Sequence, residues 1–478
     1  MQKSMRKTKI ICTMGPANQD PQVLRQMIEA GMNVARFNFS HGTHEEHQGR
    51  LDNLKALREE LGLPVAALLD TKGPEIRIKQ FANGKEQLEE GQLFTLTTRD
   101  VEGTNEIVSI TYKDLPSDVK AGSTILLADG LIRLEVESVK DTDIVCRVMN
   151  RGPISNNKGV NVPGVSLSMP YMSEKDKSDI LFGVKAGFDF IAASFTRSAQ
   201  DILDIKELLK SAGGEHIRII AKIENQEGID NIREILEASD GIMVARGDMG
   251  VEIDFTEIPM IQKDLILHSF ALGKPVVTAT QMLESMIENP RPTRAEITDV
   301  ANAIYDGTSA IMLSGETAAG KWPVEAVRTM AAIAERTEND PHYQERYGIS
   351  LEEGNLSVSA ATAHAACTVA KDLNAKAIIA ISKTGHTVRQ MCKYRSDAPI
   401  IACVMNDTVQ RQLAVSWGVT AVVMPEGNNT DEMIAHAAKV AEENGLVAKG
   451  DIVVFTAGAP IGSASSTNMI RVHTIGEV

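Results

Sequence analysis

The amino-acid sequence predicts an α/β protein: a (β/α)8 TIM barrel with an inserted all-β domain and a C-terminal α/β domain. Three observations support this fold class. In the first 345 residues, eight short runs rich in Val and Ile alternate with helical patterns, which is typical of parallel strand pairing. Between Asp70 and Pro170 this rhythm is replaced by short alternating segments separated by turn signals. Near Leu351 a second alternating series of helices and strands begins.

The barrel strands are predicted from aliphatic runs that each end in or beside a polar or charged residue. These runs are residues 9–14, 33–39, 65–70, 188–194, 217–224, 241–245, 275–280 and 309–313. Helical patterns between most of them cover residues 22–29, 45–61, 199–210, 228–238, 257–272, 294–305 and 324–336. Residues 1–70 and 170–345 are therefore assigned to the barrel, which matches the length of about 250 residues that such a barrel takes.

The remaining chain divides into two further predicted domains. Residues 71–169 are assigned to an inserted β-barrel lid, because they alternate without a helical period. Residues 346–478 are assigned to a C-terminal α/β regulatory domain that follows a polar linker at residues 339–355. Its predicted helices are 358–373, 388–394, 409–416 and 431–444, and its predicted strands are 377–382, 400–404, 421–424, 452–456 and 469–475.

Composition excludes several classes of protein. The formal net charge is −15, which disfavours a polyanionic partner, so no nucleic acid is expected. The five cysteines are odd in number and include no CxxC pair, which favours reduced thiols and a cytoplasmic location. No run approaches the roughly 18 apolar residues of a membrane helix, so no membrane partner is expected.

Polar residues gather where the predicted strands end, which is where barrel enzymes place their chemistry. Arg36, Asn38 and Ser40 lie two residues apart and therefore share one face of the second strand. The third strand ends at Asp70 and Thr71. Arg77 follows shortly after and is expected to add a cation to the same rim.

The fifth to seventh strands add a lysine, two carboxylates and a hydroxyl to this rim. Lys222 and Glu224 share a face, Asp248 follows the sixth strand, and Thr280 follows the seventh. Two carboxylates on adjacent strands suit Mg²⁺, and cations beside a hard metal suit phosphoryl transfer. A plain ion pair between Lys222 and Glu224 inside the barrel is the alternative.

Several runs resemble the pyruvate kinase family, in the family's order and over all three predicted domains. They include RFNFSHG, LLDTKGPEIR, NKGVNVPG, IIAKIENQEG, IMVARGDMGVE, TATQMLESMIENPRPTRAE and the closing GSASSTN. The resemblance implies transfer of the phosphoryl group of phosphoenolpyruvate to ADP in the last step of glycolysis, giving pyruvate and ATP. It also implies dependence on Mg²⁺ (or Mn²⁺) and K⁺, and a homotetramer.

The resemblance further implies roles for matching positions. Lys222, Arg36 and Thr280 would be catalytic, with Lys222 stabilising the phosphoryl group in transit. Glu224 and Asp248 would bind Mg²⁺. The substrate would also meet Ala245, Gly247 and Asp248. The nucleotide would meet Asn38, His41, Arg77 and Lys158. The K⁺ ligands would be Asn38, Ser40, Asp70 and Thr71, and Glu75 matches the K⁺-dependent form of the family.

A loop in the C-terminal domain is a candidate effector site. It follows a predicted strand and opens a helix, where backbone N–H groups favour phosphate. The family uses this loop for a sugar phosphate, so fructose 1,6-bisphosphate, ribose 5-phosphate or AMP is expected to activate. Residues 458–468 are expected to close over the loop, and a plain structural turn is the alternative. The loop residues are Ser382, Lys383, Thr384, Gly385 and Thr387.

Two other functions stay open on the residues alone. A barrel lyase or aldolase would also stabilise an enolate on Mg²⁺, but it leaves the cations of the rim without a role. A non-catalytic sensor would bind a sugar phosphate through the C-terminal domain, but it leaves the whole rim without a role. The near P-loop at residues 315–322 is rejected, because Trp322 stands where a Ser or Thr would ligate Mg²⁺.

Overall fold

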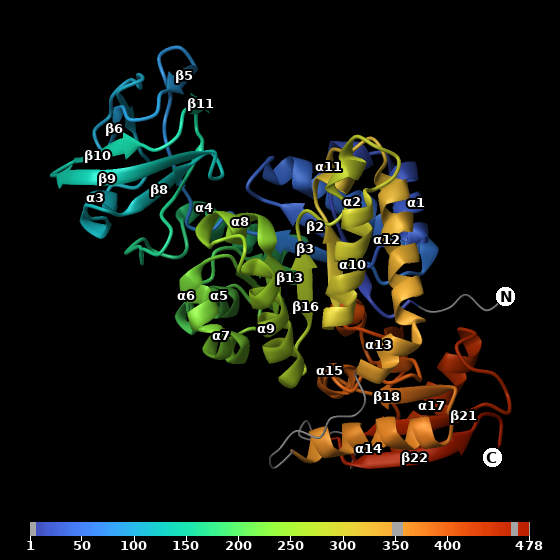
Figure 1. Ribbon diagram of the computed structural model, residues 1–478. Helices are drawn as coiled ribbons and strands as arrows, with labels where there is room; N and C mark the ends of the chain where they lie inside the picture. The colour runs from blue at the N-terminus through green and yellow to red at the C-terminus, as the bar shows by residue number, and fades with distance from the viewer. Residues whose placement is uncertain (1–5, 347–356, 460–466, 478) are drawn as a thin grey trace.

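The barrel is closed, as predicted. The computed structural model describes residues 6–346, 357–459 and 467–477. Eight parallel strands close in the order β1-β17-β16-β15-β14-β13-β3-β2 (Figure 1). Their aliphatic residues are buried on both faces, as parallel strands covered by helices require. The strands are β1 (Lys9–Thr13), β2 (Val34–Asn38), β3 (Ala66–Asp70), β13 (Phe190–Ala193), β14 (Arg218–Ile223), β15 (Gly241–Ala245), β16 (Val276–Ala279) and β17 (Ala310–Leu313).

The helices around the barrel differ from the prediction in four places: one predicted helix is split, and α4, α8 and α11 were not predicted. The predicted helix 228–238 is two helices, because Asn231 leaves the helical conformation between them. Helix α4 was not predicted, although Ser173 and Asp176 form a capping box at its start. The helices are α1 (Pro21–Ala30), α2 (His44–Leu61), α4 (Glu174–Ala186), α5 (Ala199–Ser211), α6 (Gln226–Asp230), α7 (Ile232–Ala238), α8 (Arg246–Glu252), α9 (Ile258–Ala271), α10 (Arg294–Asp306), α11 (Gly315–Ala318) and α12 (Pro323–Glu338), with short 3-10 turns η1 (Pro16–Asn18) and η2 (Glu284–Ile287).

The inserted domain lies between β3 and α4 and stands away from the barrel body (Figure 1). Its main sheet has the order β4-β12-β8-β9-β10-β6-β7, and β11 pairs with β5 separately. Alternate residues of β9 are buried, so one face of the sheet covers a core of its own. The elements are β4 (Ile76–Arg77), β5 (Lys85–Leu88), β6 (Leu93–Thr97), β7 (Ile107–Ser109), α3 (Leu115–Asp118), β8 (Thr124–Leu127), β9 (Ile132–Lys140), β10 (Asp143–Val148), β11 (Gly152–Ser155) and β12 (Gly159–Asn161).

The C-terminal domain is a five-stranded sheet with helices. Its strand order is β20-β19-β18-β21-β22, and only the edge strand β22 is antiparallel. Within the predicted polar linker, α13 (Pro341–Arg346) is helical, and Pro341 at its first position favours a helix because the φ angle of proline suits one. The elements are α14 (Val358–Asp372), β18 (Ala377–Ile381), α15 (His386–Cys392), β19 (Ile400–Val404), α16 (Asp407–Gln412), η3 (Leu413–Val415), β20 (Val419–Val423), α17 (Thr430–Glu443), β21 (Ile452–Ala457) and β22 (Met469–Thr474).

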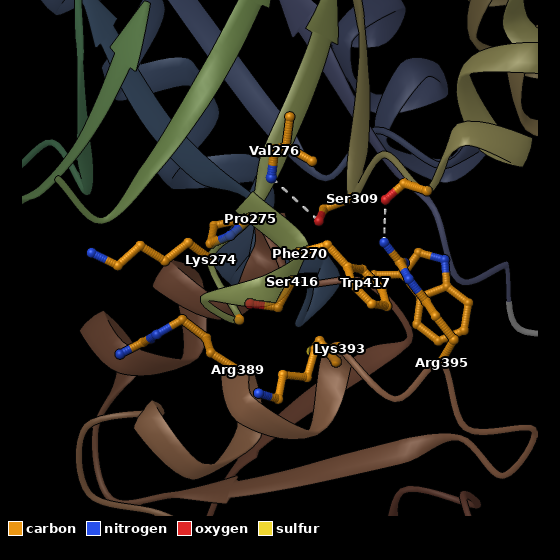
Figure 2. A pocket seen from close by; sticks show the side chains of 13 residues that line it. Phe270, Lys274, Pro275, Val276, Ser309, Arg389, Lys393, Arg395, Ser416 and Trp417 are labelled. Atoms are coloured by element: carbon orange, nitrogen blue, oxygen red, sulfur yellow. Dashed lines mark hydrogen bonds between the residues drawn. The ribbon is translucent and has the colours of Figure 1, made fainter. Parts of the chain in front are cut away.

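The C-terminal domain packs against the end of the barrel opposite the inserted domain (Figure 1). Figure 2 shows this joint, where Arg395 reaches from the C-terminal domain and donates a hydrogen bond to the Gly307 carbonyl at the end of α10. The Arg395 guanidinium also lies 4.4 Å from the centre of the Trp417 ring. The hollow beside them has about 20 Å³, which is room for a single water molecule. The joint is therefore packed.

Within the described part of the chain, none of the helices combines the length and the apolar surface that crossing a membrane requires.

Candidate active site

Lys222 is the centre of a buried polar cluster at the carboxyl ends of the barrel strands. Its Nζ lies 3.2 Å from Asp70 Oδ1 and 2.9 Å from Glu224 Oε1. It also donates a hydrogen bond to Ser194 Oγ at 2.7 Å. Burial alone would lower the pKa of Lys222, but Asp70 and Glu224 outweigh burial and raise it above its ordinary value. The side chain therefore presents a fixed ammonium ion at the barrel mouth.

Asp70 orients a second cation beside this lysine. Its Oδ2 accepts a hydrogen bond from Arg36 Nε at 2.5 Å, and Arg36 Nη1 donates to Thr13 Oγ1 at 3.0 Å. Burial alone would raise the pKa of Asp70, but Arg36 and Lys222 outweigh burial and lower it, so the carboxylate stays charged. Asn38 stands opposite Asp70 in the pairing of β2 with β3, and Asn38 Oδ1 accepts from the Ser40 backbone N–H.

The two predicted metal ligands differ in environment. Glu224 is fully buried, and its Oε2 accepts a hydrogen bond from the Phe195 backbone N–H at 2.6 Å. Its Oε1 accepts no hydrogen bond of good geometry, although Lys222 lies close. Burial raises the pKa of Glu224; Lys222 opposes the increase, and the charge of Asp248 adds to it. Asp248 is exposed on α8 instead of ending a strand, because the chain turns into a helix directly after Ala245.

These carboxylates fit a hard divalent cation. Apart from the Lys222 ammonium at 2.9 Å, Glu224 Oε1 has no partner among the residues that the structure describes, and the charge of Asp248 raises the pKa of Glu224, so a cation between the two carboxylates would be favourable. Among the described residues, no group of three or more His, Cys, Asp or Glu side chains has the arrangement of a metal site. A cation held by only two carboxylates keeps its other positions for water and substrate oxygens, which is the usual habit of Mg²⁺.

Thr280 holds an unusual backbone conformation opposite the start of α8. Its φ is 71° and that of Gln281 is 53°, a region that costs about 1–3 kcal/mol for residues with a side chain. The conformation lets Thr280 Oγ1 accept the Gly247 N–H at 2.7 Å. Arg246 secures it by donating to the Thr280 carbonyl at 2.6 Å and pairing with Asp299 at 2.8 Å.

Some predicted site residues lie outside the Lys222 cluster. Arg77 was expected on the barrel rim, but it lies on β4 of the inserted domain, because the chain leaves the barrel directly after Thr71. There it pairs with Glu75 at 2.5 Å. Lys158 and His41 are exposed. Thr71 is buried, and its Oγ1 is already engaged, accepting from the Ser194 N–H.

Sequence reasoning missed two members of the cluster. Ser194 donates to Asp70 Oδ1 at 3.0 Å while it accepts from Lys222, so it links both charges. The sequence could have indicated Ser194, because it is the polar residue that ends the fourth predicted strand. Thr13, the partner of Arg36, ends the first strand in the same way. The general rule on strand ends would have found both.

A cleft of about 330 Å³ opens between this rim and the inserted domain. The barrel contributes Asp248, Phe195 and the segment at the start of α6, and the inserted domain contributes Glu75 and β12. Arg197 and Leu167 also line the cleft, and Arg197 donates to the Leu167 carbonyl at 2.9 Å. The cleft is large enough for a small phosphorylated substrate, and residues of both domains would contact that substrate.

The candidate effector loop connects β18 to α15. Gly385, at φ 74°, donates its N–H to Ser382 Oγ at 3.0 Å, which closes the turn. Lys383 pairs with Glu426 at 2.5 Å. The hydroxyl of Thr387 hydrogen-bonds that of Thr467, so one end of the closing segment meets the loop. Residues 460–466 of that segment lie outside the described residues.

Comparison with known proteins identifies relatives over nearly the whole chain. The family model for the pyruvate kinase barrel domain matches residues 5–327, and that for the pyruvate kinase alpha/beta domain matches residues 360–473. Pyruvate kinase of Geobacillus stearothermophilus is 52% identical over 99% of this chain and 81% of the relative. Pyruvate kinase of Clostridium acetobutylicum is 50% identical over 98% of this chain and 100% of the relative. The crystal structure of a pyruvate kinase from Cryptosporidium parvum superposes with a TM-score of 0.91 at 39% identity, covering 98% of this chain and 96% of that one.

Proposed function

The chain belongs to the pyruvate kinase family, and we propose that it transfers the phosphoryl group of phosphoenolpyruvate to ADP, giving pyruvate and ATP, at the mouth of its barrel. The observation that carries the proposal is the buried Lys222 ammonium, held between Asp70, Glu224 and Ser194 at the ends of three strands. A preplaced cation of this kind stabilises charge that develops in the transition state without reorganising.

Lys222 and Arg36 would act on the substrate's phosphoryl group. Asp70 holds Arg36 in place through Nε, which leaves the outer edge of the guanidinium for a phosphate oxygen. Lys222 would stabilise the charge of the phosphoryl group while this group is transferred from the enol oxygen to ADP. Both cations are ordered before substrate arrives, so little conformational entropy is lost on binding.

We assign the metal sites by chemistry and register. Glu224 and Asp248 would hold Mg²⁺ (or Mn²⁺), which when bound supplies positive charge to the oxygens of substrate and nucleotide. Asn38, Ser40, Asp70 and Thr71 would hold K⁺; the pairing of Asn38 with Asp70 supports this assignment. Lys222 and Arg36 already balance the charge of Asp70, so a monovalent ion suits this oxygen set better than a second divalent one.

The start of α8 would seat the substrate's carboxylate. The backbone of Ala245 and Gly247, together with Thr280 Oγ1, forms a small polar surface there. Loss of the phosphoryl group leaves an enolate, which takes a proton at carbon to give pyruvate. We assign the delivery of that proton to Thr280 and a water relay. The strained backbone of Thr280 supports a functional role for this residue, because such strain is concentrated at active sites.

We also propose an effector site, an oligomeric state and a cellular location for the enzyme. A phosphorylated effector would bind at Ser382, Lys383, Thr384, Gly385 and Thr387, and the contact of Thr387 with Thr467 supports closure over it. A homotetramer is supported by apolar side chains exposed on and beside α9, including Phe255, Met260 and Leu267. The five unpaired cysteines support a role in cytoplasmic glycolysis.

One coupled assay tests the proposal. With phosphoenolpyruvate, ADP and Mg²⁺, we expect pyruvate to form in a lactate-dehydrogenase-coupled reaction, faster with K⁺ than without. Fructose 1,6-bisphosphate, ribose 5-phosphate and AMP are then titrated, and one of them is expected to lower the apparent KM for phosphoenolpyruvate. Pyruvate formation without ADP would favour the lyase alternative, and no formation under any condition would refute the proposal.

A further inference from the structure

A side-chain hydrogen bond joins the inserted domain to the helix that carries Asp248. Asn161 Nδ2, at the end of β12, donates to Glu252 Oε1, at the end of α8, at 2.7 Å. Both side chains are partly buried. Burial raises the pKa of Glu252, the bond from Asn161 opposes this increase, and the charge of Asp248 adds to it. Glu252 therefore lies within electrostatic reach of the proposed metal ligand.

Each end of this bond is attached to proposed site residues by rigid secondary structure. On the barrel side, Gly247 and Asp248 belong to the same seven-residue helix as Glu252. On the other side, Lys158 directly precedes β12, and Gly159 pairs with Arg77 of β4. Strand β12 lies between β4 and β8 in the main sheet, so holding Asn161 holds that sheet.

We propose that Asn161 and Glu252 form a latch that positions the inserted domain, and with it Arg77 and Lys158, over the start of α8. Asn161 and Glu252 are positioning residues: they act through the nucleotide contacts and the helix, not on reacting atoms. The inference deepens the proposed function and rests on it. Both residues line the cleft that Asp248 and Glu75 also line, so a shift at the latch changes the width of the site.

The latch predicts a specific kinetic change. Two of the expected nucleotide contacts, Arg77 and Lys158, lie on the inserted domain, whereas Lys222 and Arg36 stay in the barrel whether or not the latch is formed. Loss of the latch is therefore expected to raise the KM for ADP while the kcat at saturating ADP changes little. A general loss of structure would lower kcat and thermal stability together.

The test reverses the hydrogen bond. Asn161→Asp places two carboxylates face to face and is expected to raise the KM for ADP at least about tenfold, with kcat within about threefold. Adding Glu252→Gln restores an amide–carboxylate pair with donor and acceptor exchanged, and is expected to bring the KM back to within about threefold of the parent. Small-angle X-ray scattering is expected to show a larger radius of gyration for Asn161→Asp than for the parent or the double variant.

A matched control exists inside the inserted domain. Asn83 Nδ2 donates to Glu86 Oε1 at 3.1 Å, the same chemical pair without crossing between domains. Asn83→Asp is expected to leave both KM and scattering unchanged. A double variant no better than Asn161→Asp, or equal effects of Asn83→Asp and Asn161→Asp, would overturn the latch. An inactive parent enzyme would refute the proposed function instead, and the scattering comparison would still decide whether the latch positions the domain.

Discussion

At the scale of single residues, the site depends on opposite charges that are buried together. Lys222 without Asp70 and Glu224 would be an isolated buried cation, and Glu224 without Lys222 would be an isolated buried anion, whereas Asp70 would keep its pair with Arg36. Asp70 and Glu224 keep Lys222 charged, Arg36 and Lys222 keep Asp70 charged, and Ser194 bridges Lys222 and Asp70. The cluster is therefore prepared to receive a polyanionic substrate before that substrate binds.

The variant Lys222→Met tests the role of the ammonium ion. We expect turnover to fall by at least about 10²-fold, because one preorganised electrostatic contact contributes about 2.7–4 kcal/mol to the barrier. Binding of phosphoenolpyruvate, followed by calorimetry, is expected to persist. Ser194→Ala is the control, since it removes a hydrogen bond but leaves the charge. A Lys222→Met enzyme that keeps more than about a tenth of kcat would contradict the role.

At the scale of elements, the barrel is closed by a contact between its first and last units. The buried Asn18 donates to the carbonyl of Thr13, at the end of β1, and to that of Thr317, in α11. Gly15 passes so close to α11 that an added Cβ would lie 2.3 Å from the Ala318 carbonyl oxygen. The atoms that would crowd this Cβ belong to the Ala318 backbone. Because no side-chain rotation can move them away, a glycine is required at position 15.

Gly15→Ala is therefore expected to destabilise the fold. Overpacking of this kind costs about 1–3 kcal/mol, and we expect the midpoint of thermal unfolding to fall accordingly. Gly49→Ala is the matched control, because Gly49 lies within α2 with no atom within 4 Å of its added Cβ. Alanine there is expected to stabilise by about 0.5–1 kcal/mol. Equal unfolding midpoints for the two variants would show that the close approach carries no strain.

At the scale of the whole molecule, the barrel floor and the C-terminal domain share a buried polar joint. Lys9, at the start of β1, donates its Nζ to the Val419 carbonyl of β20 at 2.6 Å. Burial lowers the pKa of Lys9 to about 8, and the nearby Arg6 contributes to the decrease. The lysine joins two domains at the cost of burying a charge at neutral pH.

This joint predicts a pH dependence of stability. The folded-state pKa of Lys9, about 8, lies below the unfolded value of about 10.4, so the folded protein binds fewer protons between these values. The Lys9 contribution to stability therefore increases as the pH rises from about 8 to about 10. Relative to Lys9→Met, the parent is expected to gain about 2 kcal/mol of unfolding free energy between pH 7 and pH 10, measured by urea unfolding. A difference that is the same at every pH would contradict the assignment.

Much of this protein follows from local pattern. The aliphatic runs and their period predict eight barrel strands, and the polar residues that end them predict the cluster around Lys222, because parallel strands bring their carboxyl ends to one edge. The same rule locates Ser194 and Thr13, which the prediction passed over. The position of Arg77 did not follow, since nothing local shows that the chain leaves the barrel before that residue.

Sequence alone determined the fold class and many of the residues that meet at the barrel mouth, because these depend on periodicity and on strand order, and it indicated the family through motifs that resemble it. Tertiary structure decided what depends on contacts distant in the chain. The hydrogen bond from Gly247 to the left-handed Thr280 and the hydrogen bond from Asn161 to Glu252 each join segments separated by many residues. Such contacts are selected by the packing of whole elements against one another, and no window of neighbouring residues contains that information.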